Sequence, residues 1–385
     1  MFNLLIIVIY LAFISLGLPD ALLGSSWPIM HLEMNVPLSY AGIISMIIAL
    51  GTIISSLLSD KLTKRFSSFK VTLVSVLLTA FALFGFSISS SFWMLVLFAI
   101  PYGIGAGGVD ASLNNYVALN YSSKHMSWLH CMWGVGASFG PYIMSYSLIN
   151  NGSWNNGYLI ISIIQIILTF IILMSMPLWK NNKENEFQRV KSLSLKEIWN
   201  LKGARFIIIA FFCYCALEQT CGLWASSYLV IRFDIEEEVA ALFASLFYLG
   251  ITIGRFVNGF LTIKYSDKVL IRCGMIIIFI GIAFVFLPFN VILSYIGILI
   301  IGLGCAPIYP CIIHSTPYIF GEDKSQALVG VEMASAYLGT LLAPPLFGLI
   351  ANYITINLYP LYLLIILVVM FIMYERLVKI KSKNI

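Results

Sequence analysis

The chain contains 385 residues, of which 60% are hydrophobic and only 10% are charged, and its formal net charge is +5. A soluble globular domain carries roughly 25% charged residues, so this composition excludes an ordinary soluble protein. Apolar runs recur along the whole chain, and about 20 helical residues are enough to cross a bilayer. The sequence therefore predicts an all-α integral membrane protein with twelve transmembrane helices, at residues 3–30, 38–59, 69–90, 92–119, 125–149, 157–178, 204–231, 239–263, 267–288, 291–314, 325–350 and 355–376.

The first span carries a carboxylate, Asp20. At the rise of an α-helix, Asp20 lies ~25 Å along the span, beyond the break that Gly17 and Pro19 should create. We therefore expect Asp20 in the outer half of the membrane. The span has neither a basic leader nor a small-residue cleavage site, so we expect it to remain in the mature protein.

A short polar segment, Ser56 to Phe66, follows the second span and is predicted to be a loop. An acid here can face a helix N-terminus, and the bases beside it can pair with acids of a neighbouring segment. Such a charge latch would break when two halves of a protein rock apart. The alternative is an ordinary basic loop on the cytoplasmic side. The residues of this candidate gate are Asp60, Lys61, Lys64 and Arg65.

Asp110 lies in the middle of the fourth span. A charge at the bilayer centre costs about 2.5–3.5 kcal/mol on insertion scales, so an intramembrane acid indicates function. Glycines at positions 103, 105, 107 and 108 would let a neighbouring backbone come close, and Asn114 adds an amide one turn later. The alternative is an aspartate that a neighbour satisfies for helix packing alone.

Other polar and aromatic residues inside the spans complete a candidate site. A carboxyl group away from water favours its neutral form and can carry a proton; ionised, it could bind sodium or accept a hydrogen bond from a substrate hydroxyl. The predicted ion-coupling residues are Asp20, Asp110 and Glu218. The predicted substrate contacts are Asp110, Asn114, His130, Trp133, Tyr214, Gln219, Trp224, Asn258, Tyr309 and Tyr337. His130 could instead be structural, and each aromatic residue could serve packing or anchor the helix at the interface.

Two further charges lie inside the membrane, ~10–12 Å from the cytoplasmic ends of spans eight and eleven at the helical rise. They are Arg255 and Glu332. Because each would otherwise be unpaired, we predict that they pair with each other or close a cytoplasmic gate. The seven cysteines fall inside spans, and the spacing of Cys213 and Cys215 does not suit zinc. We predict no metal and no cofactor other than a co-transported proton or sodium ion.

The chain divides into two halves that repeat each other about 200 residues apart. Gly51 corresponds to Gly254, and Asp20 to Glu218. The basic residues gather in loops on one side, so the positive-inside rule places both termini and the central connector in the cytoplasm. The basic excess thus reports topology and predicts no nucleic-acid partner. The predicted units are an N-terminal six-helix bundle at 1–178, a cytoplasmic linker at 179–204 and a C-terminal six-helix bundle at 205–385.

A parallel repeat of six helices plus six resembles the major facilitator superfamily, whose halves rock around a site near the midplane. The segment Ser56–Phe66 resembles that superfamily's signature, with Ser56 and Thr63 replacing two glycines. Four stretches together resemble the fucose–proton symporter family, namely Gly17–Pro28, the Asp110 segment, Leu129–Pro141 and Tyr214–Tyr228.

The resemblance implies a central cavity lined by spans one, four, seven and ten, and sugar uptake with a cation. It assigns ion coupling and sugar binding to Asp20 and Asp110. The fucose symporter has Glu at the position of Asp110, Gln at that of His130 and Asn at that of Trp133, so a different sugar is expected.

We predict a secondary active transporter that takes up sugar with a cation, a proton rather than sodium, and not an enzyme. A proton-driven exporter is the main alternative, although Gly140 and Pro141 are not followed by that signature's Gly-Gly. A membrane-embedded enzyme using His130 would need a nucleophile or metal cluster that the sequence lacks. We expect a monomer in a bacterial inner membrane, whose partners are a small-molecule substrate, the coupling cation and the bilayer.

Overall fold

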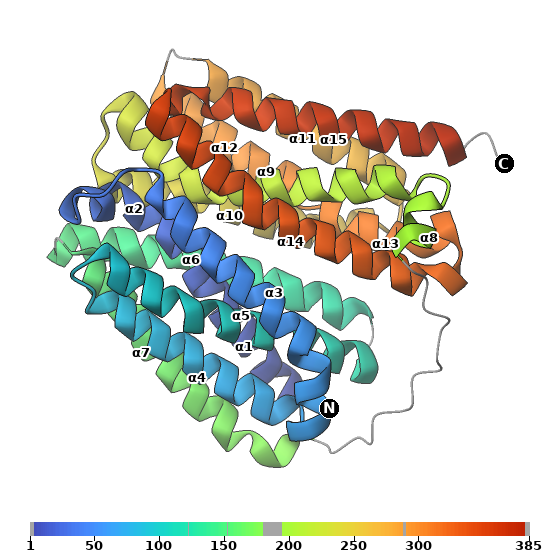
Figure 1. Ribbon diagram of the computed structural model, residues 1–385, viewed down its shortest axis with the longest axis horizontal. Coiled ribbons are helices and arrows are strands. Elements are labelled where there is room, and N and C mark those ends of the chain that lie inside the picture. The colour runs from blue at the N-terminus through green and yellow to red at the C-terminus, as the bar shows by residue number, and fades with distance from the viewer. Residues whose placement is uncertain (1–3, 122, 152, 180–194, 288–289, 382–385) are drawn as a thin grey trace.

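The computed structural model describes residues 4–121, 123–151, 153–179, 195–287 and 290–381, and within these ranges every regular element is a helix (Figure 1). This confirms the predicted all-α class. The α-helices are α1 (Leu4–Asp20), α2 (Leu22–Glu33), α3 (Tyr40–Phe66), α4 (Ser68–Ser87), α5 (Phe92–Asn120), α6 (Ser123–Asn151), α7 (Trp154–Met174), α8 (Leu195–Asn200), α9 (Ala204–Phe233), α10 (Glu237–Leu261), α11 (Asp267–Phe286), α12 (Val291–Cys305), α13 (Ile308–Phe320), α14 (Glu322–Tyr353) and α15 (Tyr359–Lys381). Two 3₁₀ turns, η1 (Met176–Leu178) and η2 (Ile356–Leu358), complete the set.

Among the described residues, eleven helical stretches are long and apolar enough to cross a membrane, with α1–α2 and α12–α13 each counting as one. The predicted fifth span is α6, whose many serine, glycine and aromatic residues lower its mean hydropathy. It is as long as the others and packs along α1 and α10. The twelve predicted spans therefore all correspond to helices.

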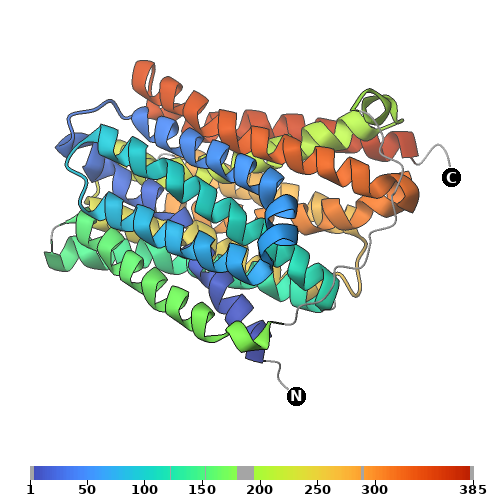
Figure 2. The same ribbon diagram turned by 60° about the horizontal axis from the view of Figure 1, so that its bottom comes forward.

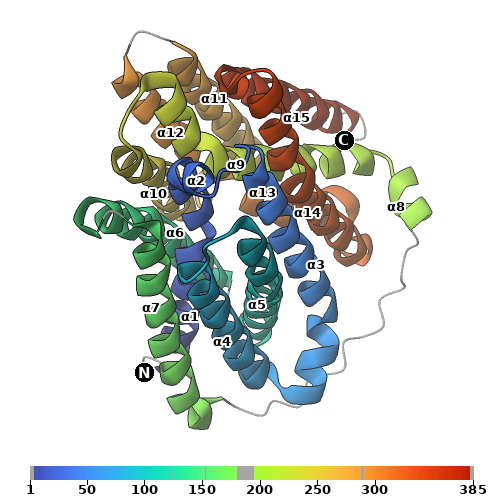
Figure 3. The same cartoon turned by 60° about the vertical axis from the view of Figure 1, so that its left-hand side comes forward.

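The helices form two bundles, α1–α7 and α9–α15, which lie side by side (Figures 2 and 3). The repeat seen in the sequence reappears in the packing. Gly51 of α3 lies against Gly103 of α5, and its counterpart Gly254 of α10 lies against Leu303 of α12. In both bundles a glycine brings the second span onto the fourth.

The first span breaks where the sequence predicted. Pro19 lies near the end of α1, Asp20 is its last residue, and α2 begins at Leu22 after a turn at Ala21. Proline removes a backbone donor and crowds the preceding turn. The break therefore lets Asp20 leave the helical ladder beside the space between the bundles.

Tight backbone contacts join the two bundles at the end of the molecule that carries α2, opposite α8 and the C-terminus (Figure 1). A Cβ atom at Gly24 of α2 would lie 2.5 Å from the carbonyl oxygen of Gly222 in α9. A Cβ atom at Gly42 of α3 would lie 2.6 Å from Cα of Pro345 in α14. Because real Cβ atoms do not approach this closely, only glycine permits these contacts. The α2 end of the molecule is closed.

The prediction of a loop after the second span is wrong. Residues 56–66 continue α3, which ends at Phe66 where Ser67 adopts a φ of 75°. The serine and threonine that replace the signature glycines let the helix run on. The linker prediction concerns residues 179–204, of which 180–194 lie outside the described residues. Its described end contains the short helix α8.

Candidate functional site

A cavity of about 260 Å³ lies between the two bundles, and helices of both contribute to its wall. Small-molecule sites commonly measure roughly 300–1,000 Å³, so this cavity suits a small solute. It combines acids, a guanidinium group and aromatic rings, the mixture expected for an oriented polar ligand. The predicted residues that line it are Asp20, Asp110, His130, Trp133, Glu218, Gln219, Arg255, Tyr309 and Tyr337.

Asp20 is held by two donors from neighbouring helices. The Tyr102 hydroxyl donates to one carboxylate oxygen at 2.9 Å, and the Trp133 indole N–H donates to the other at 2.7 Å. Asp20 remains accessible from the cavity. Both donors hydrogen-bond to the ionised carboxylate and stabilise it, so protonation of Asp20 would weaken this contact between α1, α5 and α6.

Asp110 lines the cavity from α5, a helix that packs closely on α3 and α4. Any side chain at Gly103 or Gly107 would collide with α3 carbonyl oxygens, and one at Gly105 or Gly108 would collide with Ser75 of α4. This confirms the close approach predicted for these glycines. The Asn114 amide donates to one Asp110 oxygen at 2.8 Å. Asn114 therefore acts behind Asp110 and is not itself among the cavity-lining residues.

The predicted pairing of Arg255 with Glu332 is wrong. Arg255 lies 3.6 Å from Glu218, and its guanidinium carbon lies 5.0 Å from the Trp133 ring centre, within cation–π range. Glu332 is fully buried within the C-terminal bundle, where the Thr316 hydroxyl lies 3.0 and 3.1 Å from its two oxygens. The helical rise predicts how far along the helix each residue lies but not on which face of the helix, and the face determines the partner.

The imidazole of His130 packs between two aromatic rings of different bundles. Its centroid lies 5.8 Å from that of Phe13, edge to face, and 6.3 Å from that of Tyr309. The backbone carbonyl of His130 accepts a long hydrogen bond from Arg255 at 3.5 Å. His130 therefore contributes wall and shape, and its ring is available to a ligand on the cavity side.

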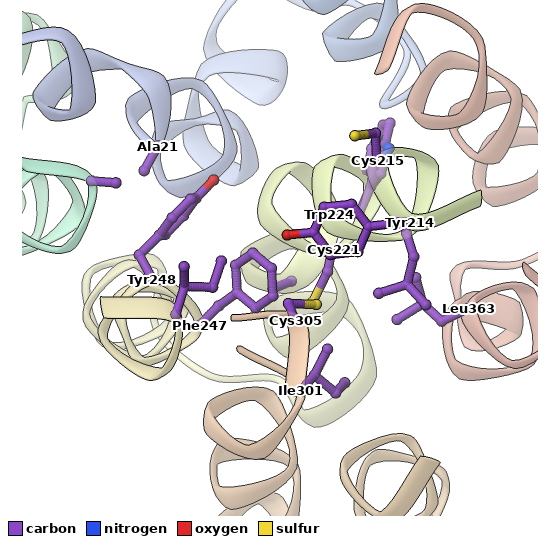
Figure 4. Close-up of a cluster of buried hydrophobic side chains, with 14 of the residues drawn as sticks. Ala21, Tyr214, Cys215, Cys221, Trp224, Phe247, Tyr248, Ile301, Cys305 and Leu363 are labelled. Atoms are coloured by element: carbon purple, nitrogen blue, oxygen red, sulfur yellow. The ribbon is translucent and has the colours of Figure 1, made fainter. Parts of the chain in front are cut away.

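Besides Asn114, three further predicted substrate contacts lie outside the cavity lining. Trp224 is fully buried, and its indole N–H donates to the Pro344 carbonyl at 2.9 Å. Tyr214 lies behind Tyr309, with ring centroids 6.2 Å apart. Asn258 is buried beside Cys311 of α13. Figure 4 shows Tyr214 and Trp224 within the hydrophobic cluster around α9. Their position corrects the prediction of direct contact and favours the packing alternative.

Replacing Trp224 with Phe should destabilise the C-terminal bundle without changing ligand affinity. The variant keeps the ring contact with Phe347 but leaves the Pro344 carbonyl without its donor, which costs about 1–3 kcal/mol. Thermal unfolding of purified protein should show a lower midpoint. An unchanged midpoint together with loss of ligand binding would instead place Trp224 in the site.

The predicted cytoplasmic gate is described only in part. The side chains of Asp60, Lys61 and Lys64 lie outside the described residues, although their backbone belongs to α3. Arg65 is exposed, and its guanidinium carbon lies 5.2 Å from the Phe66 ring. The latch therefore stays a prediction.

Sequence reasoning missed two tyrosines that line the cavity, Tyr102 and Tyr248. Tyr102 holds Asp20, as described above. Tyr248 lies edge-on to Trp133 at 6.3 Å, and Gly222 leaves room for its hydroxyl. The spacing of Tyr102 and Asp110, eight residues or just over two helical turns, was a usable signal for a shared face.

Two helical bundles around a cavity of charged and aromatic side chains define a membrane transporter. The sequence profile of the Major Facilitator Superfamily matches residues 9–244 and 225–384. The chain belongs to this superfamily.

Several known proteins are similar to the chain over most of its length. The glucose/mannose transporter GlcP of Bacillus subtilis is 25% identical, over 90% of this chain and 88% of its own. Bypass of stop codon protein 6 of Saccharomyces cerevisiae is 22% identical, over 93% of this chain and 79% of its own. Among solved structures, the nucleoside transporter NupG superposes with a TM-score of 0.78 at 13% identity, over 97% of this chain and 98% of that chain. The structure of a bacterial homologue of the human lysosomal transporter Spinster, in an inward-facing and occupied conformation, superposes with a TM-score of 0.74 at 11% sequence identity. The match covers 99% of this chain and 97% of that chain.

Proposed function

We propose that this transporter takes up a monosaccharide together with a cation, a proton rather than sodium, by alternating access. The observation that carries the proposal is the meeting of Asp20 and Asp110 in one cavity between the bundles. Intramembrane acids at a cavity are costly and serve ion pathways. Across the cavity from these acids lie tyrosines and the Gln219 amide of the C-terminal bundle, so one ligand can touch both bundles.

The sugar class rests on three supports. The cavity is small and rich in hydrogen-bonding groups, which suits a compact polyol better than a bulky lipophilic drug. Its tyrosine and tryptophan rings can pack on the C–H face of a sugar while polar groups bond its hydroxyls. A relative named as a glucose/mannose transporter aligns along nearly the whole chain.

Coupling follows from the state of the two aspartates. With both ionised, the cavity holds like charges on the N-terminal bundle, which disfavours its closure around a neutral sugar. Asn114 donates to one oxygen of Asp110, and the other oxygen accepts no hydrogen bond from the described residues. A cation that binds Asp110 neutralises one of the two negative charges. The loaded cavity can then close and the bundles rock. The cytoplasmic orientation of the termini would make the closed α2 end the outer one.

The test is uptake by purified protein in liposomes, with labelled hexoses, deoxyhexoses and nucleosides. A proton gradient and a sodium gradient are imposed separately, and protein-free liposomes serve as the control. Accumulation of one sugar under the proton gradient supports the proposal and names the sugar. Failure of every sugar to enter, with efflux of a lipophilic cation instead, would favour an exporter of the same superfamily.

A further inference from the structure

The Glu218–Arg255 pair on the C-terminal side of the cavity is incompletely satisfied. At 3.6 Å the two groups are close enough for an ion pair but too far apart for a good hydrogen bond. Both side chains are largely buried, with 8% and 13% of their surface exposed, and both line the cavity. The buried Glu218 Oε1 accepts no hydrogen bond from the described residues. A buried acceptor of this kind calls for a donor.

The surroundings fix how a ligand can approach the pair. The Trp133 ring covers one face of the Arg255 guanidinium at 5.0 Å, which leaves the N–H edge of the guanidinium for hydrogen bonds. Tyr214 lies close enough to interact with both charged groups, and its buried hydroxyl also has no hydrogen-bond partner among the described residues. Gln219, the next residue of α9, also lines the cavity. Glu218, Gln219 and Arg255 therefore contribute to the same cavity wall.

The chemistry of the pair suits a hydroxyl group. A carboxylate only accepts hydrogen bonds and a guanidinium only donates them, whereas a hydroxyl does both. An ammonium group could donate to Glu218 but could not accept from Arg255, and a carboxylate could do only the reverse. The three acids of the cavity further disfavour an anion. Two neighbouring hydroxyls of a neutral sugar satisfy both residues at once.

We propose that Glu218 and Arg255 form a subsite that binds a pair of neighbouring hydroxyl groups on a neutral sugar. This inference rests on the proposed sugar transport and refines it. Glu218 then sets substrate specificity. The alignment of Glu218 with Asp20 in the sequence repeat had instead predicted an ion-coupling role. Its negative charge is balanced by Arg255 whether or not the coupling cation is bound, whereas no base pairs with Asp20 or Asp110 in the described part of the chain.

The experiment combines residue variants with deoxy sugars. Equilibrium binding of the transported sugar, and of its analogues that each lack one hydroxyl, is measured on full-length wild type, Glu218→Gln and Arg255→Lys. Arg255→Lys keeps the positive charge but loses the planar array of N–H donors of the guanidinium group. If Glu218→Gln does not fold, the binding measurements on Arg255→Lys test the proposal. Glu375→Gln is the matched control. Glu375 forms an ion pair with Arg272 at a distance of 2.5 Å, and neither residue lines the cavity.

We expect Glu218→Gln to bind the full sugar about 10- to 100-fold more weakly, the range for a hydrogen bond to a charged group. The deoxy analogue that lacks the recognised hydroxyl should bind wild type and Glu218→Gln equally, whereas the other analogues should keep the difference. Arg255→Lys should show the same pattern at that hydroxyl or the adjacent one. Sugar accumulation by Glu218→Gln should require a higher sugar concentration, in proportion to its weaker binding.

Two results would overturn the inference. One is equal weakening of all analogues, which would indicate an indirect effect on the fold of the cavity. The other is wild-type affinity in Glu218→Gln together with loss of gradient-driven accumulation, which would make Glu218 a coupling residue. Failure of wild type to bind any sugar is a separate outcome, because it would remove the proposed function itself.

Discussion

Replacing Asp110 with Asn is expected to abolish accumulation of sugar against its gradient while sparing exchange of sugar across the membrane. The amide cannot take up or release a proton, so the cavity has one negative charge fewer in both directions of transport. It keeps nearly the same shape and can still bond Asn114. Accumulation in liposomes should fall to the level of protein-free vesicles. Counterflow of labelled sugar, which needs no gradient, should remain within about tenfold of wild type.

Asp267→Asn is the control for this prediction. Asp267 is an acid at the start of α11 that contacts His314 at 2.7 Å, and it does not line the cavity. Its variant should accumulate sugar as wild type does. Full accumulation by Asp110→Asn would remove Asp110 from the coupling machinery.

Replacing Gly24 with Leu is expected to open the α2 end of the molecule. A Cβ atom at Gly24 would lie 2.5 Å from the Gly222 carbonyl oxygen, a backbone atom that cannot turn aside. Overpacking costs about 1–3 kcal/mol, which corresponds to a shift of about 5- to 150-fold between two conformations. Because this contact joins α2 of one bundle to α9 of the other, the strain falls on the closed state alone.

The opening can be followed by labelling Leu23→Cys, a cavity position on α2, in a background without the native cysteines. An impermeant maleimide added from outside should label the Gly24→Leu variant faster than the variant with Gly24 intact. Gly259→Leu is the matched control, because nothing lies within 4 Å of a Cβ atom there. Unchanged labelling in Gly24→Leu would show that the glycine contact does not hold this end closed.

Much of the fold could be predicted because membrane-spanning helices require long apolar runs, which are visible in the sequence. The break before Asp20 was predictable from Pro19, since proline acts locally. The end of the second span could not be predicted in this way, because a polar helix and a polar loop have similar amino-acid compositions. Residues 56–66 lack the glycines that would have ended α3, and this signal was weaker than the resemblance to a loop signature.

The site was predictable in its chemistry and less so in its contacts. Buried acids such as Asp20 and Asp110 stand out in any apolar span. Aromatic residues do not, because the same indole serves in Trp133 as a donor to the site and in Trp224 as a donor to the Pro344 carbonyl. The partner of Arg255 depended on the rotation of α10 against α9 and α14, which the spacing of charges along the chain does not encode.

The most direct measurement is cation movement driven by sugar. Liposomes containing the protein and a trapped pH dye receive the transported sugar outside, with no ion gradient imposed. We expect acidification inside as sugar enters, and none with Asp110→Asn or with an untransported sugar. Entry of sugar without acidification inside would contradict proton-coupled transport.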